Sequence, residues 1–225
     1  MTEPKILIHA CNRRIEYVIG FLEPRLKDQG FKNIEVFLDS ENKGCLASYI
    51  ESYKKLPRKG HTWHLQDDVL PDRRFYQWAC ESESFDGIIC GFGNKWFYNK
   101  EMFGEAHNQH EMFYSFPCIR IPNIICHEWL EWFERVKDEV PEIASRLSEN
   151  KYVDYFFKLF IGSNPGKIPI LNFKPCIVEH IDDYIGHSVV NAARVMPARA
   201  LIFEDDESLE EFKKWTRINF PDYEV

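Results

Sequence analysis

Two kinds of hydrophobic pattern alternate along the first part of the chain. Short, nearly continuous apolar runs, which are typical of buried strands, cover residues 5–11, 34–38, 61–66 and 86–91. Between them, apolar residues recur at helical spacing and predict helices over residues 15–26 and 46–53, followed by a third helix that opens at Pro71. Alternating strands and helices indicate βαβ units, so we expect an α/β fold with a Rossmann-like, mainly parallel sheet flanked by helices.

The second part of the chain has a less regular pattern. Residues 92–116 contain eight aromatic residues, which suit either an acceptor site or lid, or plain core packing. Residues 114–122 predict a strand whose prolines are typical of a sheet edge. Helices are expected over residues 127–140, 141–147 and 152–160, an extended segment over residues 169–181, and a last helix that opens with a capping box at Ser208. No low-complexity linker divides the chain, so we expect one domain over residues 1–225.

The composition of the 225 residues, 44% hydrophobic and 28% charged, is typical of a soluble globular protein. The net charge of −8 disfavours nucleic acid as the main partner, although basic clusters at residues 13–14 and 54–59 leave a nucleic-acid acceptor open. Seven cysteines without a C-x-x-C pair indicate a reducing compartment. Because there is no signal-peptide pattern and no long apolar run, we expect a cytoplasmic protein without a membrane partner.

Polar residues follow each of the first three predicted strands. Asn12 and Arg13 follow the first strand, Asp39 ends the second, and Asp67 and Asp68 follow the third. Right-handed crossovers place the carboxyl ends of parallel strands on one edge of the sheet, where the nucleotide sites of α/β proteins lie. We therefore expect these side chains to lie along the same edge.

The adjacent aspartates are the main candidates for chemistry. Carboxylate oxygens suit a hard divalent cation. Neighbouring side chains on an extended chain diverge, so one aspartate would bind the metal while the other accepts a hydrogen bond from a ribose or sugar hydroxyl. The alternative is that Asp68 only helps to cap the helix expected from Pro71. On these residues alone, the two interpretations are equally favoured.

Two later segments add candidate residues. His180 and Ser188 lie in a segment that also contains Asp182 and Asp183; a neutral histidine suits a metal and a hydroxyl suits a phosphate, although an ordinary loop explains each residue equally simply. Asp154 lies in a strongly apolar predicted helix, where a carboxylate is unfavourable unless it is paired or functional. The alternative for Asp154 is a place on the exposed face of that helix.

Two passages together resemble a known group of proteins. The passage W-H-L-Q-D-D-V-L-P at residues 63–71, with P-C-I-V-E-H-I-D-D-Y-I-G-H-S-V-V-N at residues 175–191, is similar to small GT-A-type glycosyltransferases. The resemblance is to glycosyltransferase-like proteins of bacteriophage and bacterial genomes, which are distantly similar to the family 25 enzymes, and it spans residues 5–191. It implies a GT-A fold in which residues 1–91 form the nucleotide-binding half and residues 92–225 form the acceptor-side half and the C-terminal helix.

The resemblance also implies a donor site around a divalent metal, Mn²⁺ or Mg²⁺, that bridges the diphosphate of a nucleotide sugar such as a UDP-sugar. The implied metal ligands are Asp68 and His180. The implied contacts to the nucleotide, ribose, sugar or phosphate are Arg13, Asn12, Asp39, Asp67 and Ser188. Gln66 departs from the pattern, because it stands where such enzymes often have a first acidic residue, and this puts the affinity for metal in doubt.

The implied activity is metal-dependent transfer of a sugar to a hydroxyl of a glycan, a protein or a modified base of phage DNA, in the host cytoplasm if the protein is phage-encoded. The metal would stabilise the leaving diphosphate as a Lewis acid. Asp67 and Asp154 are the catalytic candidates, and an inverting reaction would use Asp154 as the base. The alternatives are nucleotidyl transfer at the same sheet edge and a non-catalytic binding protein with the same fold.

Overall fold

The computed structural model describes residues 3–92, 106–107, 116–138, 153–164, 167–172, 176–181 and 203–220. Its central sheet consists of the strands β1 (Lys5–Cys11), β2 (Asn33–Asp39), β3 (His61–Gln66), β5 (Ile88–Cys90), β6 (Ala106–His107), β7 (Cys118–Pro122) and β8 (Ile170–Asn172). The strand order is β2-β1-β3-β7-β5-β8-β6. Only β7 and β6 pair antiparallel with their neighbours, so five of the seven strands run in one direction. The expected α/β fold with a mainly parallel sheet is confirmed.

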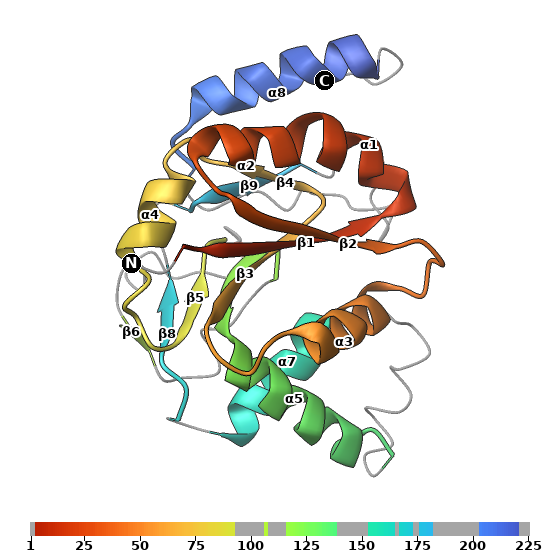
Figure 1. The fold of residues 1–225 in the computed structure, drawn as a ribbon, viewed down its shortest axis with the longest axis vertical. Coiled ribbons are helices and arrows are strands. Elements are labelled where there is room, and N and C mark those ends of the chain that lie inside the picture. The colour runs from red at the N-terminus through yellow and green to blue at the C-terminus, as the bar shows by residue number, and fades with distance from the viewer. Residues whose placement is uncertain are drawn as a thin grey trace.

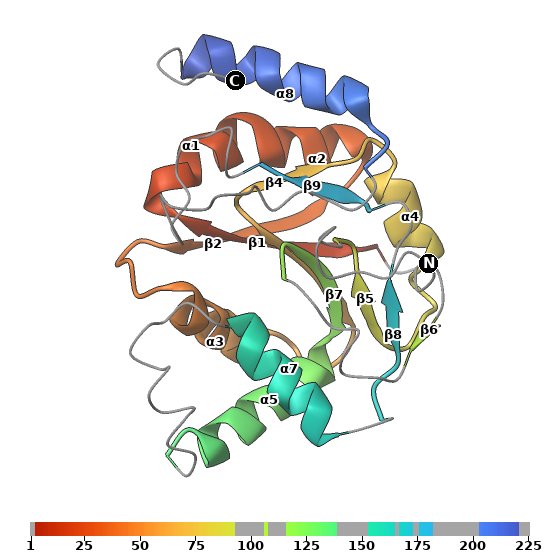
Figure 2. The same cartoon turned by 180° about the vertical axis from the view of Figure 1, so that it is seen from behind.

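Helices cover both faces of this sheet. They are α1 (Ile15–Tyr17), α2 (Glu23–Gln29), α3 (Cys45–Lys55), α4 (Phe75–Glu81), α5 (Asn123–Val136), α7 (Val153–Ser163) and α8 (Asp206–Asn219). α1 and α2 lie on one side of the sheet with α8 outside them, and α3, α5 and α7 lie on the other side (Figure 1). The view from behind shows the same layers, with the short sheet of β4 (Val69–Pro71) and β9 (Val178–His180) beneath α2 (Figure 2).

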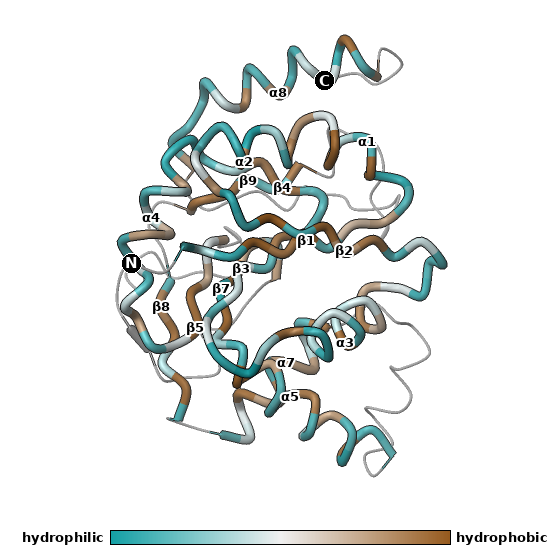
Figure 3. Tube along the Cα trace, viewed as in Figure 1, coloured by the Kyte–Doolittle hydropathy of each residue, from teal (hydrophilic) through white to brown (hydrophobic). Residues whose placement is uncertain are grey.

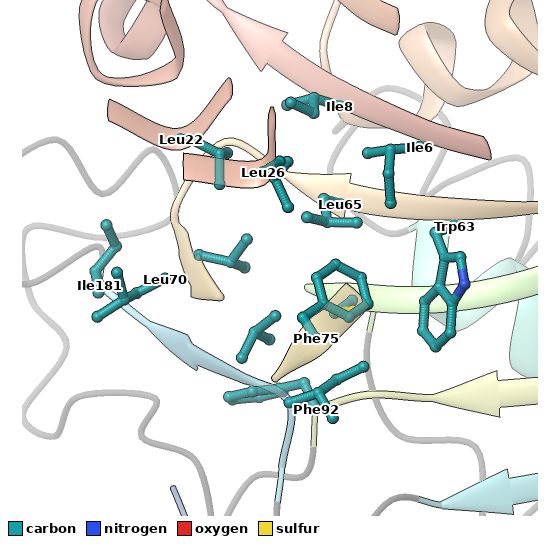
Figure 4. Close-up of a cluster of buried hydrophobic side chains, with 14 of the residues drawn as sticks. Ile6, Ile8, Leu22, Leu26, Trp63, Leu65, Leu70, Phe75, Phe92 and Ile181 are labelled. Atoms are coloured by element: carbon teal, nitrogen blue, oxygen red, sulfur yellow. The ribbon is translucent and has the colours of Figure 1, made fainter. Parts of the chain in front are cut away.

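The side chains of β1 alternate between two hydrophobic cores, as the two-residue period of a strand requires. Ile6 and Ile8 face the core under α1 and α2, which Figure 4 shows in close-up, whereas Leu7 faces the core under α3 and α5. The central strands are hydrophobic along much of their length, whereas α8 is mostly hydrophilic (Figure 3). A strand buried on both faces accounts for the continuous apolar run in the sequence.

The segment from Asn12 to Gln29 is helical throughout but changes pitch. A 3-10 turn, η1 (Asn12–Arg14), precedes α1, and a π-helical stretch, η2 (Val18–Leu22), joins α1 to α2. Pro24 has no amide hydrogen to donate to the carbonyl four residues earlier, and the wider turn of η2 ends two residues before it. The helix ends at Gly30, whose φ of 116° is a left-handed conformation that glycine adopts without strain.

Two predictions about individual elements are wrong. Pro71 does not open a helix, because residues 69–71 form β4 and pair antiparallel with β9, and α4 begins only at Phe75. The strand over residues 118–122 is not an edge strand, because β7 lies between β3 and β5. Its prolines fit there because Pro117 precedes the strand and Pro122 is its last residue.

The start of α8 also differs from the prediction. The cap is Asp205 rather than Ser208: the Asp205 carboxylate accepts a hydrogen bond from the backbone N–H of Ser208 at 3.1 Å. The capping interaction is therefore of the expected kind, but it begins three residues earlier in the chain. The predicted helix over residues 141–147 and nearly all of the aromatic segment at residues 92–116 lie outside the described residues. Among the described helices, none is long and apolar enough to cross a lipid bilayer.

Candidate functional site

A pocket of about 170 Å³ lies at the carboxyl ends of β1, β2 and β3. It is lined by His9, Ala10, Cys11, Arg14, Asp39, Cys45, Ser48, Tyr49, Gln66, Asp67 and Asp68. A second pocket of about 290 Å³ adjoins it between β2 and α3 and shares Asp39 and Ser48 with it. The expected gathering of Asp39, Asp67 and Asp68 at one sheet edge is confirmed. Asn12 and Arg13 are exposed beside this edge and are not among the residues that line the first pocket.

Arg14 joins the two adjacent aspartates. Its Nη1 atom lies 2.5 Å from Oδ1 of Asp67 and 2.7 Å from Oδ2 of Asp68, so a single nitrogen bridges the two carboxylates. All three side chains are buried, with residue exposures of 7%, 4% and 6% respectively. Arg13, and not Arg14, was expected at this position from the sequence, because the pitch of η1 decides which of the two arginines turns back towards the sheet.

The electrostatics of this cluster follow from burial and from the opposed charges. Burial raises the pKa of Asp67, and the neighbouring Arg14 opposes that rise without cancelling it. For Arg14, burial alone would lower the pKa, but the carboxylates of Asp68 and Asp67 raise it above its usual range. Arg14 therefore carries a permanent positive charge between the aspartates.

The two aspartates differ in how fully their oxygens are bonded. Oδ1 of Asp67 accepts from Arg14, and Oδ2 accepts from the backbone N–H of Cys11 at 2.7 Å. In Asp68, Oδ2 faces Arg14 and lies 3.5 Å from Nε2 of His180. Oδ1 of Asp68 is buried and has no hydrogen-bond partner among the described residues. Such an atom marks a place where a ligand can donate a hydrogen bond.

His180 lies beside Asp68, as the sequence led us to expect. The pairing of β4 with β9 aligns Val69 with His180, and the backbone N–H of Ile181 donates to the carbonyl oxygen of Asp68 at 2.9 Å. Two segments about 110 residues apart in the sequence are thus joined at the site. Ser188, the expected phosphate contact, lies outside the described residues.

Asp39 and Asn12 organise the loop between β2 and α3. The carboxylate of Asp39 accepts hydrogen bonds from the backbone N–H groups of Lys43 at 2.9 Å and Gly44 at 2.8 Å. Nδ2 of Asn12 donates to the carbonyl oxygen of Ser40 at 2.9 Å. Asp39 also lines both pockets, and an ionised carboxylate has lone pairs for further donors, so a contact to a ribose stays a prediction.

His9 lines the pocket and pairs with a second buried histidine, His64. The ring of His9 stacks on Tyr49 with the centroids 3.7 Å apart, and its Nε2 lies 3.0 Å from Nδ1 of His64. Burial, and then the neighbouring His64, lower the pKa of His9 well below its usual value; burial and then Lys5 lower that of His64 to about 3. The pair is therefore neutral, with one ring donating to the other. His9 was not among the residues expected from the sequence, although strand alternation places it on the same face of β1 as Leu7.

Asp154 lies in the first turn of α7 and is half-buried. Its charge affects the pKa of Cys45, a residue that lines the pocket. Burial raises the pKa of the Cys45 thiol, and the carboxylate of Asp154 raises it further. Burial also raises the pKa of Asp154 itself, and its hydrogen bonds to the backbone N–H of Tyr155 and its own N–H only partly oppose this. The carboxylate is thus partly shielded from solvent and does not lie on a fully exposed face of the helix.

The described residues do not fit the expected metal in this arrangement. Mg²⁺ and Mn²⁺ need several oxygen ligands in direct contact. Among the described residues, no group of three histidine, cysteine, aspartate or glutamate side chains is arranged to hold a metal. The position between the carboxylates of Asp67 and Asp68 is occupied by Nη1 of Arg14. Asp182 and Asp183, which follow His180 in the sequence, lie outside the described residues.

Comparisons with known proteins give little beyond this geometry. No known protein family matches the chain, and no curated protein matches it. Among solved structures, it is similar to the apo form of the glycosyltransferase GlyE of Streptococcus pneumoniae TIGR4, with 10% identity and a TM-score of 0.35. The likeness covers 96% of this chain but only 64% of that chain. At this level of similarity the function has to be inferred from the residues of the site itself.

Proposed function

We propose that the protein transfers a sugar from a nucleotide-sugar donor to a hydroxyl of an acceptor, and that the donor binds at the carboxyl ends of β1, β2 and β3. The observation that supports this most is the buried cluster of Arg14, Asp67 and Asp68 in a pocket at that edge. Ligands of open α/β sheets bind outside the carboxyl ends of the strands. The cluster combines a fixed cation with a carboxylate oxygen that lacks a partner among the described residues.

The size and shape of the site suit a nucleotide sugar. The two adjoining pockets of about 170 and 290 Å³ together fall in the usual range for small-molecule sites, roughly 300–1,000 Å³. In the proposed pose, the nucleoside lies along β2 and α3 near Asp39, and the diphosphate and sugar lie towards Arg14 and Asp68. The described residues do not support the expected dependence on Mn²⁺ or Mg²⁺, because Arg14 lies between the two carboxylates. The identity of the nucleotide as uridine and the nature of the acceptor remain predictions.

The chain's own residues would contribute to the reaction in two ways. The leaving diphosphate gains negative charge as the glycosidic bond breaks, and the fixed positive charge of Arg14 would favour that change. The acceptor hydroxyl must lose a proton, which Asp154 would accept in an inverting reaction. Burial raises the pKa of Asp154, which suits a group that takes up a proton during the reaction.

The proposal is tested by ligand binding and by product analysis. A panel of nucleoside diphosphates and nucleotide sugars is measured by thermal shift, since a ligand that binds only the folded state raises the Tm. We expect stabilisation by one nucleotide class and release of the nucleoside diphosphate on turnover. Release of pyrophosphate would instead indicate nucleotidyl transfer, and the absence of binding by every nucleotide would refute the proposal.

The role of Asp154 has its own variant. We expect Asp154→Asn to lower the transfer rate by roughly 10²- to 10⁴-fold while donor binding is unchanged, because the base acts on the acceptor. In the unchanged protein the rate should rise with pH through a pKa above the usual aspartate range, and the variant should lack this rise. Asp206→Asn, at an exposed position of α8, is the matched control. An unchanged rate in Asp154→Asn would remove Asp154 from the mechanism.

A further inference from the structure

We propose that Arg14 is the permanent cation of this site, at the position where a divalent metal would bridge Asp67 and Asp68, and that Asp68 accepts a hydrogen bond from a hydroxyl of the ligand. Binding would then be independent of Mn²⁺ and Mg²⁺. The part about the cation concerns this chain's own residues alone; the part about the hydroxyl rests on the proposed function.

The first support is the position of one atom. Nη1 of Arg14 lies between one oxygen of each aspartate, at 2.5 and 2.7 Å. A bridging ion would need the same two oxygens and the same space. The side chain of Arg14 is buried, and an arginine stays charged at every pH at which the protein is folded, so the position is filled by a cation that cannot dissociate from the protein.

The second support is the charge balance. Two adjacent buried carboxylates repel each other, and the guanidinium between them neutralises one of the two negative charges and contacts both. A divalent ion could enter only if Arg14 moved away, because the metal and the guanidinium would repel each other at such short range. The guanidinium thus takes the place of a bridging ion before any ion is added.

The third support comes from the hydrogen bonds of the two aspartates, which assign them roles opposite to those expected from the sequence. Both carboxylate oxygens of Asp67 are bonded within the protein, to Arg14 and to the backbone N–H of Cys11. Asp67 therefore acts as a positioning residue for Arg14. Oδ1 of Asp68 is buried in a residue that lines the pocket and has no partner among the described residues. An ionised carboxylate only accepts hydrogen bonds, so its ligand partner must be a donor such as a sugar or ribose hydroxyl.

Whether Arg14 or a metal ion is the cation between the carboxylates is tested with Mn²⁺ alone, without any nucleotide. Binding of Mn²⁺ is followed by the loss of its free electron-spin resonance signal and by thermal shift. We expect no binding by the unchanged protein. Arg14→Met removes the charge and shortens the side chain by two atoms, which leaves the position between the carboxylates open. We expect this variant to acquire a Mn²⁺ site that EDTA reverses and that Arg14→Met combined with Asp68→Asn lacks. Arg58→Met, at an exposed arginine far from the cluster in the sequence, is the matched control.

The outcomes separate the possibilities. If the unchanged protein binds Mn²⁺ and loses it in Asp68→Asn, the proposal is overturned. If Arg14→Met fails to fold in metal-free buffer but folds when Mn²⁺ is added, the ion has replaced the missing charge, and the proposal is supported. If it folds but binds no Mn²⁺, the two carboxylates do not form a latent metal site and the proposed equivalence of the two positions is wrong.

The hydroxyl contact and the independence from metal are tested with UDP and a UDP-sugar in chelator and in Mn²⁺. We expect equal dissociation constants in both buffers, and a loss of roughly tenfold or more in Asp68→Ala, the size expected for a hydrogen bond to a charged acceptor. Binding that chelator abolishes would contradict the inference. If no nucleotide binds in either buffer, the proposed function and the hydroxyl contact fail, while the measurement with Mn²⁺ alone still decides the identity of the cation.

Discussion

Two aspartate–arginine clusters, each with a buried carboxylate, differ in how fully their carboxylate oxygens are bonded. At the start of α8, the carboxylate of Asp205 accepts from the backbone N–H of Arg73 at 2.7 Å, from the guanidinium of Arg73 at 2.8 Å, and from Ser208. Both of its oxygens are bonded within the protein. In the pocket, one oxygen of Asp68 has no such partner among the described residues. We call the cluster around Asp205 closed, because both of its carboxylate oxygens are bonded within the protein. The cluster around Asp68 leaves one carboxylate oxygen that can accept a hydrogen bond from a ligand.

The difference is also visible in the pKa values. Burial raises the pKa of Asp205, but the hydrogen bonds from Ser208 and Arg73 outweigh burial and lower it below the usual aspartate value. For Asp67 the balance is reversed, because burial outweighs the effect of Arg14. A closed cluster stabilises its charge by hydrogen bonds, as a helix cap should. In the pocket, the arginine keeps two carboxylates buried although burial disfavours their charged form, and such an arrangement is typical of a functional site.

The largest expected loss of stability comes from a substitution in the cluster around Asp205. We expect Asp205→Ala to lower the free energy of unfolding by about 2–3 kcal/mol, because it removes a helix cap, the acceptor of the backbone N–H of Arg73 and the ion-pair partner of the mostly buried Arg25. Urea denaturation measures the change. Asp206→Ala, in the same turn but exposed, should have little effect. Nucleotide binding should be unchanged in both variants; a loss of binding in Asp205→Ala would show that the two clusters are not independent.

The second prediction compares the two aspartates of the pocket. We expect Asp67→Asn to lower the free energy of unfolding by about 1–2 kcal/mol, because an asparagine can replace only one of its two bonded oxygens. Asp68→Asn should lower the free energy of unfolding by less than about 1 kcal/mol, since one oxygen of Asp68 has no partner to lose among the described residues. Urea denaturation and nucleotide titration of both variants give the comparison. The reverse order of stability would mean that Asp68, and not Asp67, positions Arg14.

The third prediction concerns the pH dependence of stability that the two buried histidines, His9 and His64, produce. Burial lowers the pKa of both His9 and His64 below the ordinary value of 6.5, so the folded state keeps them neutral while the unfolded state binds protons below that pH. The stability is thus fully present above the unfolded pKa and falls as the pH drops below it. As the pH falls from about 7.5 to 6, the two histidines together should lower the free energy of unfolding by about 1.5 kcal/mol. Urea denaturation at each pH measures this change.

A double variant is the control for this effect. His9→Phe combined with His64→Leu replaces both hydrogen-bonding partners by apolar groups, so neither is left unpaired. We expect the loss of stability between these two pH values to disappear. The lowered pKa of Asp205 acts only below the ordinary aspartate value of 3.8, where its contribution is lost as the pH falls further, so it does not interfere. A pH dependence that persists in the double variant would assign it to other groups.

The parts of the fold that the sequence predicts best are those where local pattern and burial agree. β1 and β3 are buried on both faces, so their apolar runs were recognisable, and their ends located the pocket. β4 was mistaken for the start of a helix because Pro71 suits a first helical turn equally well, and only the distant partner β9 decides between the two. β7 was placed at an edge because its neighbours in the sheet cannot be read from its own residues.

Only part of the site was predicted from the sequence, and its bonding was not. Asp67, Asp68 and His180 were expected to lie together, and they do. The expected cation was a metal, whereas Arg14 fills the position between the carboxylates. The choice between Arg13 and Arg14 depends on the pitch of one short helical turn, η1, which propensities do not determine.

The position of β7 between β3 and β5 affects the order in which the protein can assemble during synthesis. Residues 5–68 contain β1, β2 and β3, so the cluster of Arg14, Asp67 and Asp68 can form as soon as they have left the ribosome. The remaining sheet has to wait for residues 118–122, since β5 reaches β3 only through β7. His180 arrives later still, with β9. The charged centre of the pocket would thus be in place before most of the molecule that encloses it has been made.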